Sequence, residues 1–532
     1  MGIKKRRALE VPLKAESYNE AFAFIEQWMK QHGISDKTIY ETGLLFEALF
    51  QDMIDQGFPQ DTILTIKPQR VFGEYNIKLG FEGEAYIPTL KKEQEEISPE
   101  LMIVKAYSDK VGYRYRLGYN RVSIVVKRNY SSSLLSCLIA IVLAMLIATP
   151  MIAFMSKGEL NYIDTTYIKP LIKQFANAML MIGAPVTFFS LIKNLTDIYI
   201  LSEKSSSARK LQIKTIVTSL TAIFLALITG IAISIMMSSH HGYLENQGTF
   251  ANGLNAEQFI ASLVPSSIFE PFETYMPFPI IIVALLLTYA LCSIGEYFDS
   301  VHRFINICLE VFSKMVTVVM FTLPFFCFLA VLSMLMVDGT SRILILLHYV
   351  AVVFLSIIVI IAFYTVRLLI GKVNILTFAK HLPTLMWENF KINSAIDAVP
   401  FNIRYCSRKY GYSRKRLGEK LPILAQTNQD GNCFLIMLIA MIFIFMLGIE
   451  VSWLQIAGIG FLVLFLSVGA PNQPGSIVIG MLIITFYLQA DELISIAIFA
   501  EAFFGSIQNI INVLGDIVTV AIEEQKYQKQ PA

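Results

Sequence analysis

Long apolar segments follow one another closely from Ser131 onward, and they restrict the fold more than any other feature of the sequence. Most of them reach the length of about 20 residues that a helix needs to cross the hydrocarbon core of a bilayer. Hydrophobic residues make up 55% of the chain and charged residues only 16%, a composition too apolar for a soluble core. We therefore expect a mainly α-helical polytopic membrane protein. The expected spans are residues 133–156, 168–195, 212–238, 276–296, 305–336 and 343–370, with a shorter apolar segment at 255–266.

The part of the chain up to residue 128 is more polar and has other periodicities. Apolar residues recur at helical spacing in SYNEAFAFIEQWMKQHG, and they alternate as in strands in YNIKLGF and RVSIVVKR. This pattern predicts a soluble α/β sandwich domain at residues 1–128, ahead of the membrane domain. The basic start of the chain is followed by no apolar stretch of the kind found in signal peptides.

The distribution of Lys and Arg predicts the orientation in the membrane. Basic residues precede the first expected span, and they recur in SEKSSSARKLQIK and in RYCSRKYGYSRKRLGEK. The loop SSHHGYLENQGTFANGLNAEQ contains neither Lys nor Arg. Because short loops rich in Lys and Arg stay in the cytoplasm, we expect a multi-pass protein of the plasma (inner) membrane with both termini cytoplasmic. The net charge of +2 gives no reason to expect a nucleic-acid partner.

Residues 452–488 consist of two apolar arms of about 15 residues each, joined by the segment SVGAPNQPGS. At roughly 1.5 Å per residue an arm spans about 22 Å, less than the roughly 30 Å of the hydrocarbon core. Open backbone at that depth is tolerated only inside protein or beside a water-filled cavity. We interpret the segment as a re-entrant hairpin, and two short spans joined by an external loop are the alternative. Residues 374–410, which contain KINSAIDAVPFNIRY, form a candidate first hairpin.

Two polar features interrupt the apolar C-terminal third. The sequence NQDGN, residues 428–432, lies in the middle of an apolar stretch, where we expect Gly431 to break the helix. The last helix has polar or small residues spaced 4, 3, 4 and 4 apart, which places them on one face. A charge at the bilayer centre costs about 2.5–3.5 kcal/mol, so this stripe needs a polar counterpart, and Asn428 and Asp430 are the natural one. The stripe consists of Glu501, Gly505, Gln508, Asn512 and Asp516.

Broken helices with Asp and Asn side chains offer carboxylate, amide and backbone oxygens, which suit a small hard cation such as Na⁺. Two units, each a hairpin followed by a helix with polar residues, also indicate the inverted repeats of secondary transporters. For a single Asp, a role in helix capping or helix pairing is the alternative.

These residues resemble the glutamate/dicarboxylate:cation symporter family over roughly residues 130–525. The family motif Asn-Met-Asp-Gly-Thr corresponds to NQDGN, the second hairpin tip to SVGAPNQPG, the eighth helix to NVLGD, and the first tip to NSAIDAVP. The resemblance implies a non-enzymatic, homotrimeric transporter with eight helices, two re-entrant hairpins and an elevator mechanism. Helices one to six would cover residues 131–372, and residues 374–525 would form the transport core.

The resemblance also implies roles for individual residues. The expected Na⁺ ligands are Asn428, Asp430, Asn512 and Asp516. The expected substrate contacts are Ser394, Asn432, Pro474, Gly475, Gln508, Asn509 and Asn512.

Several positions depart from the family pattern. Asn432 replaces a Thr near the substrate, Gly505 replaces the Asp that takes an amino group, and Gln508 replaces the Arg that takes a side-chain carboxylate. We therefore expect uptake of another small organic anion or polar metabolite, coupled to Na⁺ or H⁺, rather than of glutamate or aspartate. A transporter-like membrane sensor that signals through the N-terminal domain is the alternative.

The N-terminal domain resembles the histidine-kinase-like ATPase fold of anti-sigma-factor serine kinases. LLFEALFQDMID is similar to the ATP-site helix, with Glu47 retained but Gln51 in place of the Mg²⁺-binding Asn. Phe81 takes the place of the Asp that contacts adenine, and Ala85 that of a Gly. The resemblance therefore implies no ATP binding and favours a docking site for a cytoplasmic protein. An unrelated α/β domain is the alternative.

Overall fold

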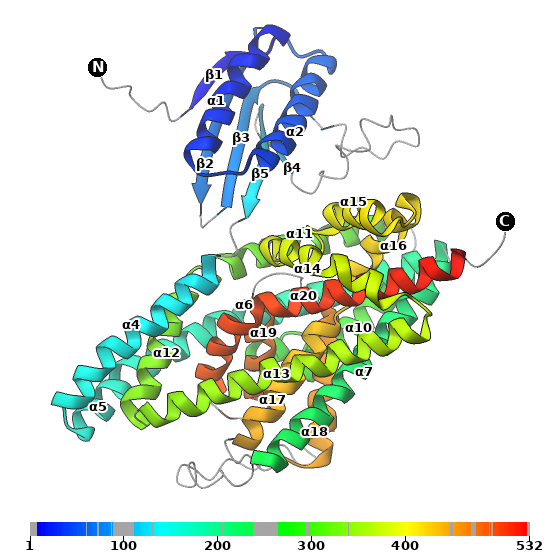
Figure 1. Cartoon of the computed structure of the whole chain (residues 1–532). Helices are drawn as coiled ribbons and strands as arrows, with labels where there is room; N and C mark the ends of the chain where they lie inside the picture. Colours follow the sequence, from blue (N-terminus) through cyan, green and yellow to red (C-terminus); the bar gives the residue numbers. More distant parts are fainter. Residues whose placement is uncertain are drawn as a thin grey trace. The chain divides into compact units, whose positions relative to one another are not determined.

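The chain forms two compact units, residues 1–130 and residues 131–532, in the computed structural model (Figure 1). The predicted apolar segment at 255–266 lies outside the described residues except for its last three positions, and Pro474 lies outside them entirely. The structure describes residues 8–59, 61–71, 74–86, 88, 111–116, 118–128, 132–204, 206–237, 264–293, 298–338, 340–446, 451–469, 475–488, 490 and 493–528.

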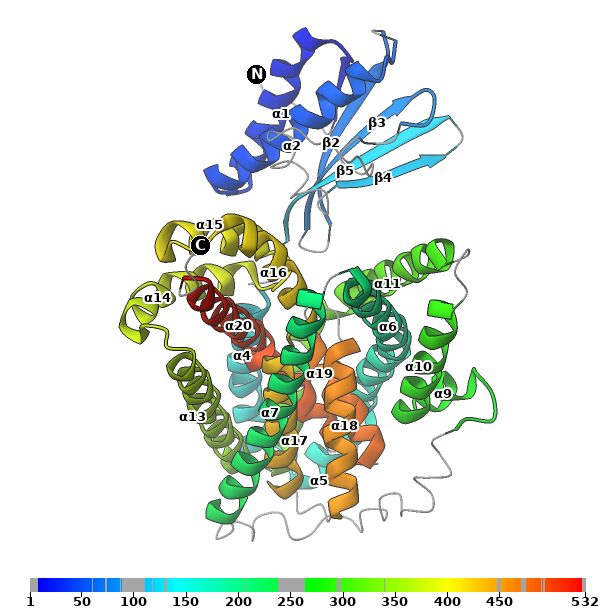
Figure 2. The same cartoon turned by 90° about the vertical axis from the view of Figure 1, so that its right-hand side faces the viewer.

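The N-terminal unit is an antiparallel sheet of five strands in the order β1-β2-β3-β5-β4, with two helices against one face (Figure 2). Alternation along the strands produces this arrangement, because Ile77, Leu79 and Phe81 are buried while Lys78 and Glu82 are exposed. The predicted sheet-containing N-terminal domain is thus present. Its elements are β1 (Leu9–Pro12), η1 (Ala15–Ser17), α1 (Tyr18–Gln31), α2 (Asp36–Asp55), β2 (Ile63–Val71), β3 (Glu74–Glu82), β4 (Val111–Arg116) and β5 (Tyr119–Arg128).

The second unit is helical throughout its described part, as the apolar segments predict. Six of its described helices are long and apolar enough to cross a membrane, or seven if α11 and α12, bent by 50°, form one span. The bend divides the span predicted at 305–336. The helices before the last third are α4 (Ser132–Phe154), α5 (Lys157–Ile163), the π-helix η4 (Asp164–Ile168), α6 (Lys169–Lys204), α7 (Ser206–Met237), α9 (Glu270–Thr274), α10 (Pro277–Ser293), α11 (Phe298–Met320), α12 (Leu323–Asp338) and α13 (Thr340–Ile370).

Two pairs of short helices precede and follow a broken helix in the last third. The first helix pair is α14 (Ile375–Ile392) and α15 (Val399–Tyr410), and the second is α18 (Trp453–Gly469) and α19 (Ser476–Leu488). At 12 to 18 residues, each arm is about 18–27 Å long, which is shorter than a hydrocarbon core. At the second tip Gly475 has φ +104°, a conformation that favours glycine.

The helix at NQDGN is broken at Asn428, not at Gly431. Asn428 ends α16 (Arg414–Thr427) with an extended backbone of φ −83° and ψ 115°, and α17 (Asp430–Met446) begins two residues later. The prediction that Gly431 breaks the helix is therefore wrong. Gly431 lies inside α17 and allows close packing, because a Cβ there would lie 2.9 Å from the Cβ of Ile511 in α20 (Leu493–Gln528).

The centre of the second unit is α17, whose residues 430–444 are all buried. Apolar residues on every side of the helix are consistent with this burial. It packs against α7 on one side and α20 on another, and Figures 1 and 2 show the three helices together. This packing brings the break at Asn428 next to the polar stripe of α20.

Candidate cation and substrate site

The polar residues at the break and on α20 form one hydrogen-bonded cluster. The Nδ2 atom of Asn428 donates to the carbonyl of Asn512 at 3.0 Å and to Oδ1 of Asp516 at 2.9 Å. The backbone N–H of Gly431 donates to Oδ1 of Asn512 at 2.7 Å. These bonds connect α17 to α20 across the break. The structure thus brings the four predicted cation ligands, Asp430 included, into one buried region.

Asp430 is fully buried and accepts hydrogen bonds from two helices that the sequence did not point to. Ser219 of α7 donates to its Oδ1 at 2.9 Å, and the hydroxyl of Tyr364 in α13 donates to its Oδ2 at 3.1 Å. Gly515 lets these groups converge, because a Cβ there would lie 2.7 Å from Nδ2 of Asn428 and 2.8 Å from the Tyr364 hydroxyl. A lone Ser or Tyr in an apolar span produces no periodic signal, so sequence reasoning missed both side chains.

The cluster is rich in oxygen and acidic. Asp430 is 0% exposed and Asp516 3% exposed, so both carboxylates are held away from water. The guanidinium of Arg367, one turn after Tyr364, donates to Oγ1 of Thr519 at 3.0 Å rather than to either carboxylate. Groups of three or more His, Cys, Asp or Glu that suit a transition metal are absent from the described residues. Carboxylate, hydroxyl and amide oxygens are instead the ligands of a hard cation.

Two of the predicted substrate residues, Gln508 and Asn509 of α20, each form a hydrogen bond with one of the helix pairs. Nδ2 of Asn509 donates to the carbonyl and to Oδ1 of Asn393 at the first tip, at 3.3 and 3.2 Å. Nε2 of Gln508 donates to Oγ of Ser476 at the start of α19. Ser394 accepts a hydrogen bond within its own turn, from the N–H of Asp397 at 3.2 Å.

Two buried amide oxygens near these contacts have no hydrogen-bond partner among the described residues. They are Oδ1 of Asn432 and Oε1 of Gln508, and both residues are 1% exposed. A buried acceptor without a donor costs about 1–3 kcal/mol, so both oxygens are suited to a ligand that donates hydrogen bonds.

Glu501 is the remaining polar member of the stripe, and its contact was not predicted. Its Oε1 accepts from the N–H of Gly475 at 2.9 Å, and its Oε2 accepts from the N–H of Val478 at 3.1 Å. The carboxylate therefore caps the start of α19. Its spacing on α20 showed that it faces the stripe, but not which helix end it reaches.

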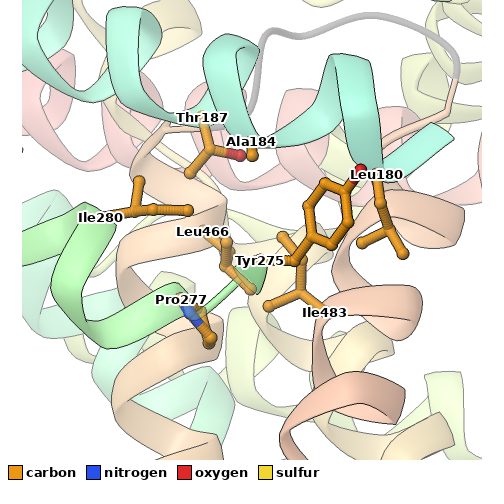
Figure 3. Close-up of a pocket in the computed structure, with 8 residues that line it drawn as sticks. All are labelled: Leu180, Ala184, Thr187, Tyr275, Pro277, Ile280, Leu466 and Ile483. Atoms are coloured by element: carbon orange, nitrogen blue, oxygen red, sulfur yellow. The ribbon is translucent and has the colours of Figure 1, made fainter. Parts of the chain in front are cut away.

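A separate small pocket lies between α6, α10 and the second helix pair (Figure 3). Only Thr187 and Tyr275 contribute polar groups to it, and it shares no residue with the polar cluster. We assign it no ligand. It is lined by Leu180, Ala184, Thr187, Tyr275, Pro277, Ile280, Leu466 and Ile483.

In the N-terminal unit, Phe81, which takes the place of the adenine-contacting Asp, is part of an aromatic core. Phe81 is 0% exposed and meets the rings of Phe58 and Tyr86 edge-on, with centroids 5.1 and 5.8 Å apart. Burial, together with a hydrogen bond to Asp52 at 2.7 Å, raises the pKa of the Tyr86 hydroxyl. The Gln51 amide lies on the exposed side of α2 and donates to Asp55 at 2.8 Å.

Comparison with known protein families finds a family model that matches the part of the chain containing the polar cluster. The model of the sodium:dicarboxylate symporter family matches residues 134–525. That range contains every residue of the cluster and both helix pairs, but none of the N-terminal unit. A search of curated proteins finds no match.

Proposed function

Because the chain belongs to the sodium:dicarboxylate symporter family, we propose that it is a secondary active symporter coupling Na⁺ to uptake of a small organic anion or polar metabolite. Membership makes the chain a membrane transporter rather than an enzyme, with Na⁺ as the implied coupling ion. The cargo class and the route of movement are the parts that we propose.

The observation that carries the proposal is the pair of buried carboxylates at the helix break. Asp430 and Asp516 lie in a region where Asn428 bonds to one of them and Ser219 to the other. Burying a charge is costly unless it is paired or coordinates a metal ion. A Na⁺ ion bound among these oxygens would neutralise part of the charge, which gives the acidic cluster a use in ion coupling. The Na⁺ ligands we propose are Asn428, Asp430, Asn512 and Asp516.

Coupling between ion and cargo follows from the contacts of α20. Asp516 and Gln508 are eight residues apart, about 12 Å along one helix face. The same face bonds to the break through Asn512 and to both tips through Asn509 and Gln508. A cation that orders the break therefore also positions the residues that we expect to contact cargo. The proposed cargo contacts are Ser394, Asn432, Pro474, Gly475, Gln508, Asn509 and Asn512.

We further propose that the protein is a homotrimer in the inner membrane, with cytoplasmic termini and two re-entrant hairpins that move in an elevator mechanism. The short arms of both helix pairs support the hairpin assignment, since neither second arm reaches the length of a span. We propose that residues 1–128 do not bind ATP and instead form a docking site for a cytoplasmic protein. We propose H⁺ as the alternative coupling ion to Na⁺.

The direct test is uptake into proteoliposomes with an imposed inward Na⁺ gradient, across a panel of labelled organic acids, amides and amino acids. We expect accumulation of at least one compound, and its loss when Na⁺ is equal on both sides. Uptake that is independent of the Na⁺ gradient would contradict the proposed coupling. Saturable binding with no accumulation of any bound compound would instead support the sensor alternative.

A further inference from the structure

The carboxylate of Glu501 occupies the anion-binding end of α19. The first N–H groups of a helix have no partner within it and lie at the positive end of its dipole, so they bind anions. In this chain two such groups, on Gly475 and Val478, already donate to the two oxygens of Glu501. Glu501 is 5% exposed, so its carboxylate is shielded from water, and the two hydrogen bonds hold it in place.

The glycine one turn later makes room for this arrangement. A Cβ at position 505 would overlap Oε1 of Glu501 and lie 3.0 Å from its Cδ. Real Cβ atoms essentially never approach another atom so closely. A side chain at position 505 would therefore push the Glu501 carboxylate out of its present place, and Gly505 leaves that place open.

We propose that Glu501 is a built-in carboxylate that takes the place of a ligand carboxylate at the second tip, so that the cargo is a neutral or cationic molecule that donates hydrogen bonds. The proposal rests on the transport function proposed above and narrows its cargo from organic anions and polar metabolites to polar metabolites without a carboxylate. A ligand carboxylate would find the N–H groups of Gly475 and Val478 already bonded. It would also bring a further negative charge close to that of Glu501.

The hydrogen-bond acceptors without a partner in the described part of the site indicate the same class of cargo. The two buried oxygens without a partner in the described part of the chain, on Asn432 and Gln508, both need a donor. An amide, an alcohol or an ammonium group supplies N–H or O–H donors, whereas a carboxylate supplies only acceptors. Glu501 is thus a specificity-determining residue that acts by occupying the anion position.

The first test is chemical rescue of the Glu501→Ala variant. The purified full-length chain is kept in a buffer that contains Na⁺, and its melting temperature is measured. The substitution should lower the melting temperature because it leaves two buried N–H groups without an acceptor. Added acetate should restore most of the loss in a concentration-dependent manner, whereas acetamide, which has the same shape but no charge, should not. The unsubstituted chain should not respond to acetate.

The matched control is Ile498→Ala, a substitution at a residue that is 0% exposed on the same helix. It should lower the melting temperature by leaving a cavity, and acetate should not restore it. If Glu501→Ala does not fold, Glu501→Ser serves instead, since its short side chain also leaves the position of the carboxylate open to acetate. No acetate response in either variant, or an equal response in the control, overturns the built-in carboxylate.

The second test compares succinate with succinamide as stabilising ligands. The unsubstituted chain should be stabilised more by succinamide than by succinate, and Glu501→Ala should shift the preference toward succinate at least tenfold. A stronger response of the unsubstituted chain to succinate overturns the cargo assignment. Na⁺-dependent stabilisation, measured in the same samples without organic ligand, tests the proposed symport separately, so the two failures are distinguishable.

Discussion

Replacing Gly431 with Ala is expected to push α17 away from α20 and to weaken both stability and Na⁺ binding. The added Cβ would overlap the carbonyl of Gln508 and lie 2.9 Å from the Cβ of Ile511 and 3.0 Å from Oδ1 of Asn512. Carbon atoms pack best at about 3.5–4.0 Å, so the two helices must separate by roughly 0.5–1 Å. Overpacking of this kind costs about 1–3 kcal/mol in the free energy of unfolding.

The same movement lengthens the bond from the N–H of Gly431 to Asn512, now 2.7 Å, and shifts the Asn428 bridge to Asp516. The Na⁺ concentration at half-maximal stabilisation should therefore rise. The assay is thermal unfolding of the detergent-solubilised chain over a Na⁺ titration at constant ionic strength. Gly460→Ala is the matched control, because its Cβ would meet nothing closer than 3.6 Å. The reasoning is refuted if Gly431→Ala keeps both the stability and the Na⁺ dependence of the unsubstituted chain.

Three further predictions concern other parts of the chain. Arg416→Ala should destabilise the second unit by about 1–3 kcal/mol, because it removes both 2.6 Å bonds to the buried Glu524, and chemical denaturation measures the loss. Asn389→Ala should cost about 1–3 kcal/mol by the same measurement, since it breaks the reciprocal amide pair with Asn402 at 2.8 and 3.1 Å, and replacing both by Leu should recover part of it. Residues 1–128 expressed alone should fold by circular dichroism yet bind Mg²⁺-ATP weakly, and clear binding by calorimetry would show that their aromatic core does not exclude the nucleotide.

The broad architecture could be predicted because it depends on local patterns. Apolar length identifies the membrane helices, and strand alternation identifies the N-terminal sheet. The stripe on α20 and the polar break meet because a 3.6-residue period places Asn512 and Asp516 on one face. That face has to be buried against other polar groups, and Asn428 is one of the few polar residues within the neighbouring apolar segments.

The contacts that depend on how helices pack could not be predicted. Ser219 and Tyr364 reach Asp430 only through the placement of α7 and α13 against α17, which no single-helix pattern encodes. Gly431 was predicted to break its helix because glycine is a poor helix former, but its role is set by the closeness of α20. The capping of α19 by Glu501 likewise depends on where the second tip lies relative to α20.

The central claim is that Asp430 and Asp516 bind Na⁺, and Na⁺-dependent stabilisation tests it most directly. The melting temperature of the full chain should rise with NaCl and not with choline chloride at equal ionic strength, since a ligand that binds only the folded state stabilises it. Asp430→Asn and Asp516→Asn should each shift the half-maximal Na⁺ concentration upward by tenfold or more. Asp164→Asn, which removes a buried carboxylate paired with Lys169 at 3.3 Å outside the cluster, should leave that concentration unchanged. If both cluster variants keep the Na⁺ response of the unsubstituted chain, the cation site is not where we place it.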